Sequence, residues 1–138
     1  MWRDLYIVRW LLQNTDRAQG AINWDRRESG MYFTNLNDGE DRVHIEVGLV
    51  QAMSAQRVAI VFASHGLGEI QLQEPLRNII TIGSKYPCEE DAELAETMLR
   101  LFAVISNQHA ERKLKEYKDE DERRQGIFSR IIGGGKID

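Results

Sequence analysis

The sequence predicts an α+β domain in which helices cover one face of an antiparallel sheet. Three observations lead to this fold class: a helical apolar pattern at the start of the chain, short alternating segments in the middle, and a long helical pattern near the end. We therefore expect an N-terminal helix, an antiparallel β-meander of four to five strands, a long C-terminal helix and a short terminal helix. In this division residues 1–110 form the globular core and residues 111–138 form a charged helical extension.

The N-terminal helix is predicted over residues 2–13. Trp2, Tyr6 and Trp10 recur in steps of four, and leucine and valine side chains occupy a neighbouring row. Apolar residues at these spacings line one wide face of a helix, and such a face needs a partner surface in the core. We therefore expect the aromatic row to be buried.

The middle of the chain carries the strand patterns. In the segment DRVHIEVGLV, residues 41–50, apolar and polar residues alternate, so one face of this strand is expected to enter the core: Val43, Ile45, Val47 and Leu49. Asp38-Gly39 precedes the segment as a turn signal, because glycine accepts the positive φ of a tight hairpin. Further strands are predicted at residues 21–25, 30–36, 57–64 and 69–73, and residues 79–82 form either another strand or part of an ordered crossover.

The last third of the chain is predicted to be helical. A helix begins at Pro87, and the acidic residues that follow complement the positive end of its dipole. Its buried stripe is expected to consist of Ala95, Met98, Leu99, Phe102 and Ile105. Residues 111–124 contain six acidic and six basic residues, which is typical of a solvated helix held by ion pairs one turn apart. Gly126 is expected to end that helix, and residues 127–132 to form the short terminal helix.

The composition restricts the classes of function. The formal net charge of −4 and the absence of a Lys/Arg stripe disfavour binding to nucleic acid. No apolar run approaches the ~20 residues of a membrane helix, so we expect no membrane partner. The single cysteine, Cys88, excludes an internal disulfide and is typical of a cytoplasmic protein. Three acidic residues directly follow Cys88 and oppose a thiolate, so we expect an unreactive thiol.

His44 and Glu46 are the candidate catalytic pair. Because they are two residues apart on one strand, their side chains share a face and could hold a divalent ion or transfer a proton, with help from Asp41 or Glu28. The alternative is that they belong to the polar half of a one-sided sheet, paired across strands with residues such as Arg57. The sequence contains no established metal motif, so we expect neither a metal nor another cofactor.

A group of apolar residues beyond the charged segment is the candidate partner-binding site. We call it the C-terminal stripe, and it consists of Leu114, Tyr117, Ile127, Phe128, Ile131 and Ile132. Either it folds back onto the sheet, or it is exposed and docks to another protein or to a second copy of the chain. We expect a non-catalytic interaction or assembly module, such as an adaptor, a chaperone-like or a regulatory protein. The alternative is a small metal-dependent or hydrolytic enzyme centred on His44 and Glu46.

Overall fold

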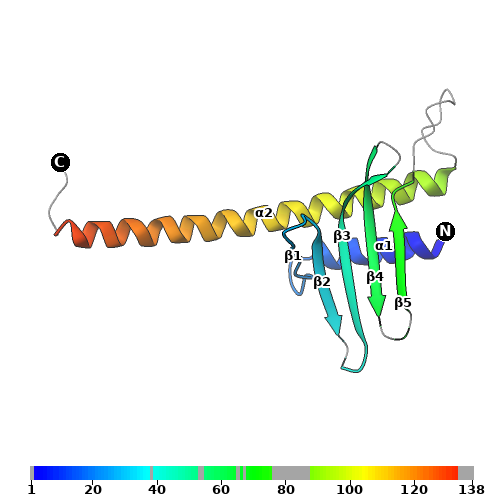
Figure 1. The fold of residues 1–138 in the computed structure, drawn as a ribbon, viewed down its shortest axis with the longest axis horizontal. Helices are drawn as coiled ribbons and strands as arrows, with labels where there is room; N and C mark the ends of the chain where they lie inside the picture. The colour runs from blue at the N-terminus through cyan, green and yellow to red at the C-terminus, as the bar shows by residue number, and fades with distance from the viewer. Residues whose placement is uncertain are drawn as a thin grey trace. The chain divides into compact units, whose positions relative to one another are not determined.

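The alternating segments in the middle of the chain form a single antiparallel sheet in the computed structural model, which describes residues 2–37, 39–52, 55–64, 66, 68–75 and 88–133. Side chains are described for all of these except residues 2, 3, 52 and 55. The elements are α1 (Trp2–Thr15), β1 (Asp25–Arg26), β2 (Tyr32–Asn37), β3 (Arg42–Ala52), β4 (Ala55–Ser64), β5 (Gly68–Gln73) and α2 (Glu89–Ile131). The strands lie in the order β1-β2-β3-β4-β5, so each pairs with its neighbour along the chain (Figure 1). The predicted α+β fold is confirmed.

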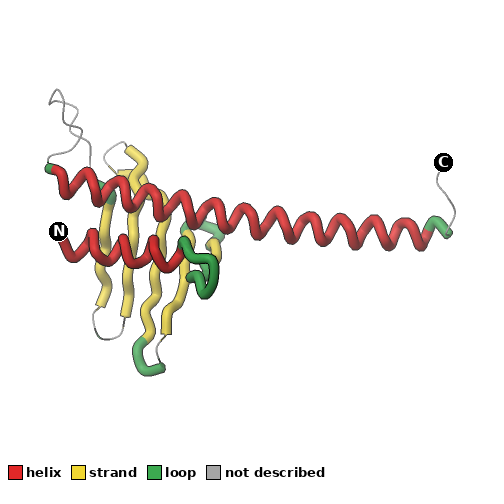
Figure 2. The backbone as a smooth tube through the Cα atoms, turned by 180° about the vertical axis from the view of Figure 1, so that it is seen from behind, coloured by secondary structure: helices red, strands yellow, loops and turns green. Residues whose placement is uncertain are grey.

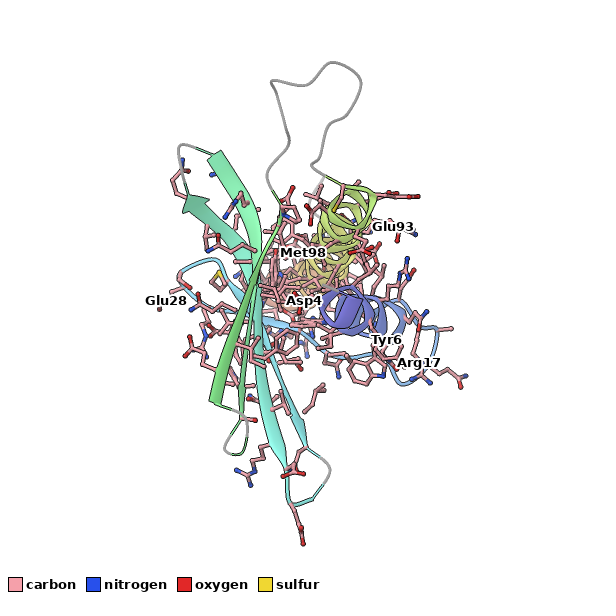
Figure 3. All side chains as sticks on the ribbon, turned by 90° about the vertical axis from the view of Figure 1, so that its right-hand side faces the viewer. Asp4, Tyr6, Arg17, Glu28, Glu93 and Met98 are labelled. Carbon is pink, nitrogen blue, oxygen red and sulfur yellow. The ribbon has the colours of Figure 1, made fainter. Side chains whose placement is uncertain are left out.

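The helices lie on one face of the sheet. The chain divides into two compact units, residues 1–106 and 107–138. Within the first unit, α1 and the part of α2 up to Ser106 pack side by side over the same face (Figure 2). Viewed along the sheet edge, α1 and the part of α2 up to Ser106 stand on one side of the sheet, and no helix among the described residues of the first unit covers the other side (Figure 3). The first unit therefore has two layers, a helical layer and the sheet, and the second face of the sheet carries no helix of this unit.

The register of β3 confirms the alternation predicted for it. Ile45 and Val47 face the helices and are fully or almost fully buried. Leu49 points the same way but is 45% exposed, so its predicted burial is wrong. The reason is that pairing of β2 with β3 ends at Tyr32 opposite Val47, which leaves Leu49 beyond the end of β2.

The segment before β2 differs most from its predicted structure. We expected a strand at residues 21–25, but β1 contains only Asp25 and Arg26. The preceding residues are held by α1 instead: the indole Nε1 of Trp24 donates a hydrogen bond to the Thr15 hydroxyl (3.0 Å), and both side chains are buried. In the next turn, Gly39 has the positive φ of 105° that the Asp-Gly signal predicted.

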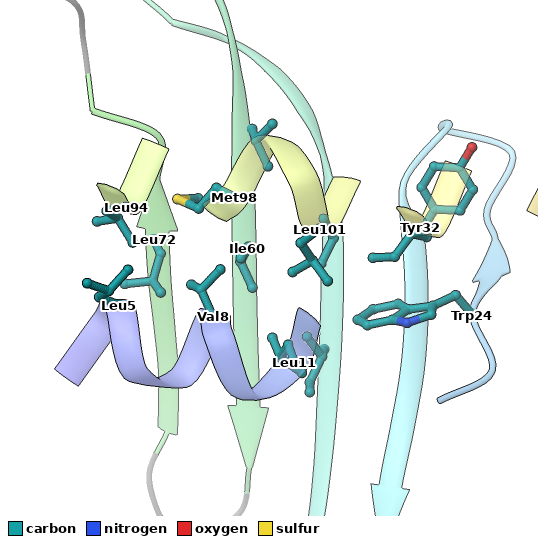
Figure 4. Close-up of a cluster of buried hydrophobic side chains, with 14 residues drawn as sticks. Leu5, Val8, Leu11, Trp24, Tyr32, Ile60, Leu72, Leu94, Met98 and Leu101 are labelled. Carbon is teal, nitrogen blue, oxygen red and sulfur yellow. The ribbon is translucent and has the colours of Figure 1, made fainter. Parts of the chain in front are cut away.

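The core row of α1 is not the aromatic one. Leu5, Val8 and Leu11 are buried against the sheet and α2 (Figure 4). Tyr6 is 74% exposed and Trp10 is 46% exposed, so the predicted burial of this row is wrong; the side chain of Trp2 lies outside the described residues. Of the two rows expected to form one wide buried face, the helix therefore buries the leucine and valine row and leaves Tyr6 and Trp10 exposed.

The first part of α2 supplies the other half of the helical layer. Its buried residues are Leu94, Ala95, Met98, Leu101 and Ile105, so three of the five predicted positions are confirmed. Leu99 is 39% exposed, which corrects its predicted burial. Phe102 lies at the margin of the core and makes an edge-to-face contact with Tyr32, with ring centroids 6.0 Å apart. The predicted helix start at Pro87 and the possible strand at residues 79–82 lie outside the described residues.

The helix α2 continues without a break through Gly126 to Ile131. The predicted helix end at Gly126 and the separate short helix at residues 127–132 are therefore wrong. A glycine inside a helix costs only about 1 kcal/mol relative to alanine, which is too little to interrupt a helix whose neighbouring turns are formed by good helix formers. The glutamate, lysine and arginine residues before Gly126 provide such turns.

Candidate functional site

His44 and Glu46 lie on the open face of the sheet, as the alternation of β3 predicts. In the antiparallel register His44 stands opposite Asn35 of β2, and Glu46 stands opposite Phe33. The ring Nδ1 of His44 is 2.7 Å from the Asn35 side-chain oxygen, and its Nε2 is 3.2 Å from Glu46 Oε1. Both ring nitrogens of His44 are therefore engaged by neighbouring side chains.

Arg27 completes this cluster from the turn between β1 and β2. The turn is closed by a hydrogen bond from the Arg27 backbone N–H to the Met31 carbonyl (2.8 Å). From there the Arg27 guanidinium lies over the ring of Phe33, 4.5 Å from its centroid, and Nε donates to Glu46 Oε1 at 2.5 Å. Its Nη2 is 3.2 Å from His44 Nε2. Pattern reasoning missed Arg27 because a turn residue shows no periodicity that would indicate where its side chain reaches.

Arg57 does not take the role that the sequence suggested for it. It lies on β4 opposite Val50, four residues along the strand from Val61, which stands opposite Glu46. Its guanidinium donates to the Gln73 side chain on β5. The expected pairing of Glu46 with Arg57 is therefore wrong, and Arg27 replaces it.

The contacts of Glu46 determine its ionisation. Partial burial by itself raises the pKa of this carboxyl, because it disfavours the charged form. Hydrogen bonds from His44 and Arg27, together with the charges of these two groups, act in the opposite direction and outweigh burial. The net result is a pKa of Glu46 below its ordinary value of 4.5, so the carboxylate is ionised at neutral pH and the Arg27 ion pair persists there.

The cluster connects elements of the sheet but gathers few metal ligands. Among the residues that the structure describes, no group of three His, Cys, Asp or Glu side chains lies close enough to hold a metal ion. Glu28 and Asp41, which were expected to contribute to a site at His44 and Glu46, therefore form no such group with them. What the geometry does provide is a side-chain link between the β1–β2 turn, β2 and β3.

A groove between the two helices is a feature that sequence patterns did not indicate. It has a volume of about 590 Å³ and lies between α1 and the first turns of α2. Its walls carry charges of both signs, and Arg9 of α1 forms an ion pair with Glu93 of α2 across it (2.9 Å). Neither residue stands out in the sequence, because the groove exists only once the two helices are packed. Cys88 is exposed just before α2 and does not line the groove.

The C-terminal stripe lies in the second unit: five of its residues are on the part of α2 after Ser106, and Ile132 directly follows the end of the helix. All six of its side chains are exposed, from 40% for Ile127 to 72% for Ile131; the others are Leu114, Tyr117, Phe128 and Ile132. None of the described residues after Ile105 is buried. The predicted partner-binding residues thus lie on α2 or, for Ile132, directly after it, and their side chains are exposed.

Charged residues surround the stripe and support the helix. Lys113 and Glu116 form an ion pair (3.2 Å), and Arg124 pairs with Glu120 one turn earlier (2.7 Å). Such exposed pairs contribute only about 0.3–0.5 kcal/mol each. They support the helix slightly but do not cover the apolar side chains.

No protein-family model, curated protein or solved structure matches the chain. No helix among the described residues is both long and apolar enough to span a membrane.

Proposed function

We propose that this protein is a non-catalytic interaction and assembly module whose contact surface is the C-terminal stripe. The observation that carries this proposal is the exposure of six large apolar side chains, five on the last part of α2 and one, Ile132, directly after it. Exposed apolar residues scattered singly over a surface are normal, but a cluster such as Ile127, Phe128, Ile131 and Ile132 is typical of a docking site. Helices commonly bind protein partners through such stripes, with anchor residues three and four positions apart.

The charges around the stripe favour a protein partner over a lipid surface. Helices that lie on membranes carry an excess of Lys and Arg on the polar face. In contrast, residues 111–124 contain equal numbers of acidic and basic residues. A balanced polar face is suited to pairing with the mixed charges of another protein surface.

A pair of aspartate substitutions tests the proposal. Phe128 is 60% exposed within the stripe, and Ser129 is its exposed neighbour outside the stripe. We expect Phe128→Asp to abolish self-association of the purified full-length chain, or the capture of a partner protein by this chain from its own cell. The reason is that the substitution places a charge in the contact surface. Ser129→Asp adds the same charge at the adjacent position and is expected to leave association unchanged. Light scattering and affinity capture of the three proteins provide the readouts.

Two results contradict the proposal. If Phe128→Asp and Ser129→Asp associate like the parent chain, the stripe is not the contact surface. If the parent chain instead sediments with lipid vesicles of neutral or anionic composition and Phe128→Asp does not, the stripe contacts membranes rather than proteins. Circular dichroism of both variants verifies that the helix is retained, since one exposed aspartate changes helix stability only slightly.

A further inference from the structure

A second periodic pattern begins where the core-forming stripe of α2 ends. The core positions Leu94, Met98, Leu101 and Ile105 follow steps of four and three, but the continuation of these steps falls on polar residues: Gln108, Arg112, Lys115 and Asp119. The new pattern also alternates steps of three and four, and we call its positions the seam: Leu114, Tyr117, Asp121, Arg124, Phe128 and Ile131. Such spacing is the heptad repeat of two helices that pack along one another.

The centre of the seam identifies the partner. Four seam positions are apolar, but Asp121 and Arg124 in the middle carry opposite charges. If two copies pair in antiparallel orientation about the point between residues 122 and 123, Asp121 of each copy faces Arg124 of the other. The same symmetry places Leu114 opposite Ile131 and Tyr117 opposite Phe128. The seam is therefore complementary to itself.

From this self-complementarity we infer that the C-terminal half of α2 binds a second copy of the chain as an antiparallel two-helix coil. The contact has four apolar layers and two central ionic layers. Paired polar residues at seam positions fix register and orientation at a cost in stability. The inference rests on the proposed function and adds the identity and the orientation of the partner.

The flanking charges favour the antiparallel over the parallel arrangement. In a parallel, in-register pair Asp121 would face Asp121 and Arg124 would face Arg124. The acidic run DEDE at residues 119–122 would also lie beside its own copy. In the antiparallel pair this run lies beside Arg123 and Arg124 of the second copy instead. Like charges held side by side repel, whereas opposite charges attract, so the charge pattern favours the antiparallel form.

The contacts within one chain are compatible with this pairing. Among the residues that the structure describes, Asp121 forms no ion pair with another side chain. Arg124 is paired with Glu120 of its own helix, and its side chain is 63% exposed. A guanidinium has five N–H donors, so Arg124 can keep this contact and also bind Asp121 of the second copy.

Charge exchange at the two central positions tests the inference. Asp121→Arg and Arg124→Asp each replace both ionic layers of the antiparallel dimer by like-charge layers, and we expect each to raise the dimer dissociation constant about tenfold or more. The double variant Asp121→Arg/Arg124→Asp restores opposite charges and is expected to dimerise like the parent chain. Sedimentation equilibrium of the full-length proteins over a range of concentrations measures all of these constants.

Matched controls carry the same changes at positions outside the seam. Asp119→Arg and Lys115→Asp alter charge by the same amounts on other positions of the helix, and we expect both to dimerise like the parent chain. In a parallel dimer Asp121→Arg would only replace one like-charge layer by another. An unchanged dimer dissociation constant for both Asp121→Arg and Arg124→Asp therefore overturns the antiparallel arrangement.

The failure of this inference is distinguishable from the failure of the proposed function. A parent chain that is monomeric at every concentration, while Phe128→Asp abolishes capture of a different protein, overturns self-pairing but leaves the C-terminal stripe as the contact surface. A parent chain that dimerises equally well with and without Phe128→Asp overturns both.

Discussion

Two neighbouring residues on α1 provide a sharp test of the fold, because the structure assigns them opposite environments. Leu5 is 2% exposed and lies near Leu72 and Leu94 in the core, whereas Tyr6 is 74% exposed (Figure 4). The aromatic periodicity in the sequence predicts instead that Tyr6 is buried together with the leucine and valine row. Substitution of each residue by alanine therefore separates the structure from the sequence pattern.

The magnitudes follow from the burial of the two side chains. Truncation of a buried leucine removes its transfer free energy and leaves a cavity, so Leu5→Ala is expected to reduce the free energy of unfolding by about 3 kcal/mol. For a unit of this size that corresponds to a decrease in Tm of roughly 10–20 °C. Tyr6→Ala removes mostly exposed surface and gains helix propensity, so its effect is expected to be within about 0.5 kcal/mol of zero.

Thermal and urea unfolding, followed by circular dichroism, measure both variants against the parent chain. The slope of the free energy with urea concentration should stay constant, since neither substitution changes the surface exposed on unfolding appreciably. If Tyr6→Ala is as destabilising as Leu5→Ala, or more so, the orientation of α1 on the sheet is wrong.

Three further predictions concern the open sheet face and the long helix. Glu46→Gln should destabilise the protein at pH 7, because it removes the ionised carboxylate that pairs with Arg27. Since the pKa of Glu46 is lowered on folding, the stabilisation by the carboxylate is fully present above the unfolded pKa near 4.5 and is lost as pH falls through the folded pKa. The free energies of unfolding of the parent chain and the variant should therefore converge in acid. A difference that grows on acidification would contradict this reasoning. Gly48→Val should lower the free energy of unfolding in urea by about 1–3 kcal/mol, because a Cβ at Gly48 would stand 3.3 Å from the Cα of Met31 and against its thioether. An unchanged free energy of unfolding would refute this close approach. Gly126→Ala should increase helical ellipticity and stabilise the helix by up to about 1 kcal/mol, since its Cβ would meet no other atom within 4 Å; a loss of helix would show that Gly126 does mark a break.

The sequence predicted the elements better than their orientation. The strict alternation of residues 42–49 has a period that only a strand explains, so β3 and its buried residues Ile45 and Val47 could be recognised directly. On α1 two adjacent rows are both apolar, and periodicity alone cannot decide which one the sheet covers. The decision comes from packing, where Leu5 and Val8 interdigitate with the core.

The site was predictable where it depends on local pattern and not where it depends on tertiary contacts. The spacing of Ile127, Phe128 and Ile131 indicated a shared helix face, and all three lie on α2. That Leu114 and Tyr117 belong to the same helix was not expected, because Gly126 was predicted to end it. The partner of Glu46 could not be inferred in the same way, because Arg27 approaches from a turn 19 residues away in sequence. Gly126 was misread for a related reason: its unfavourable propensity is local, whereas the helix persists through cooperative hydrogen bonding of the neighbouring turns.

Disulfide cross-linking between seam positions tests the central claim most directly. In a Cys88→Ser background, Leu114→Cys and Ile131→Cys are introduced together and separately into the full-length chain. The two positions are 17 residues apart on one helix, about 25 Å, so they cannot join within one chain. An antiparallel dimer predicts rapid covalent dimers on mild oxidation of the double variant and none from either single variant. Covalent dimers of the single Leu114→Cys variant, or only monomers from the double variant, would contradict the account.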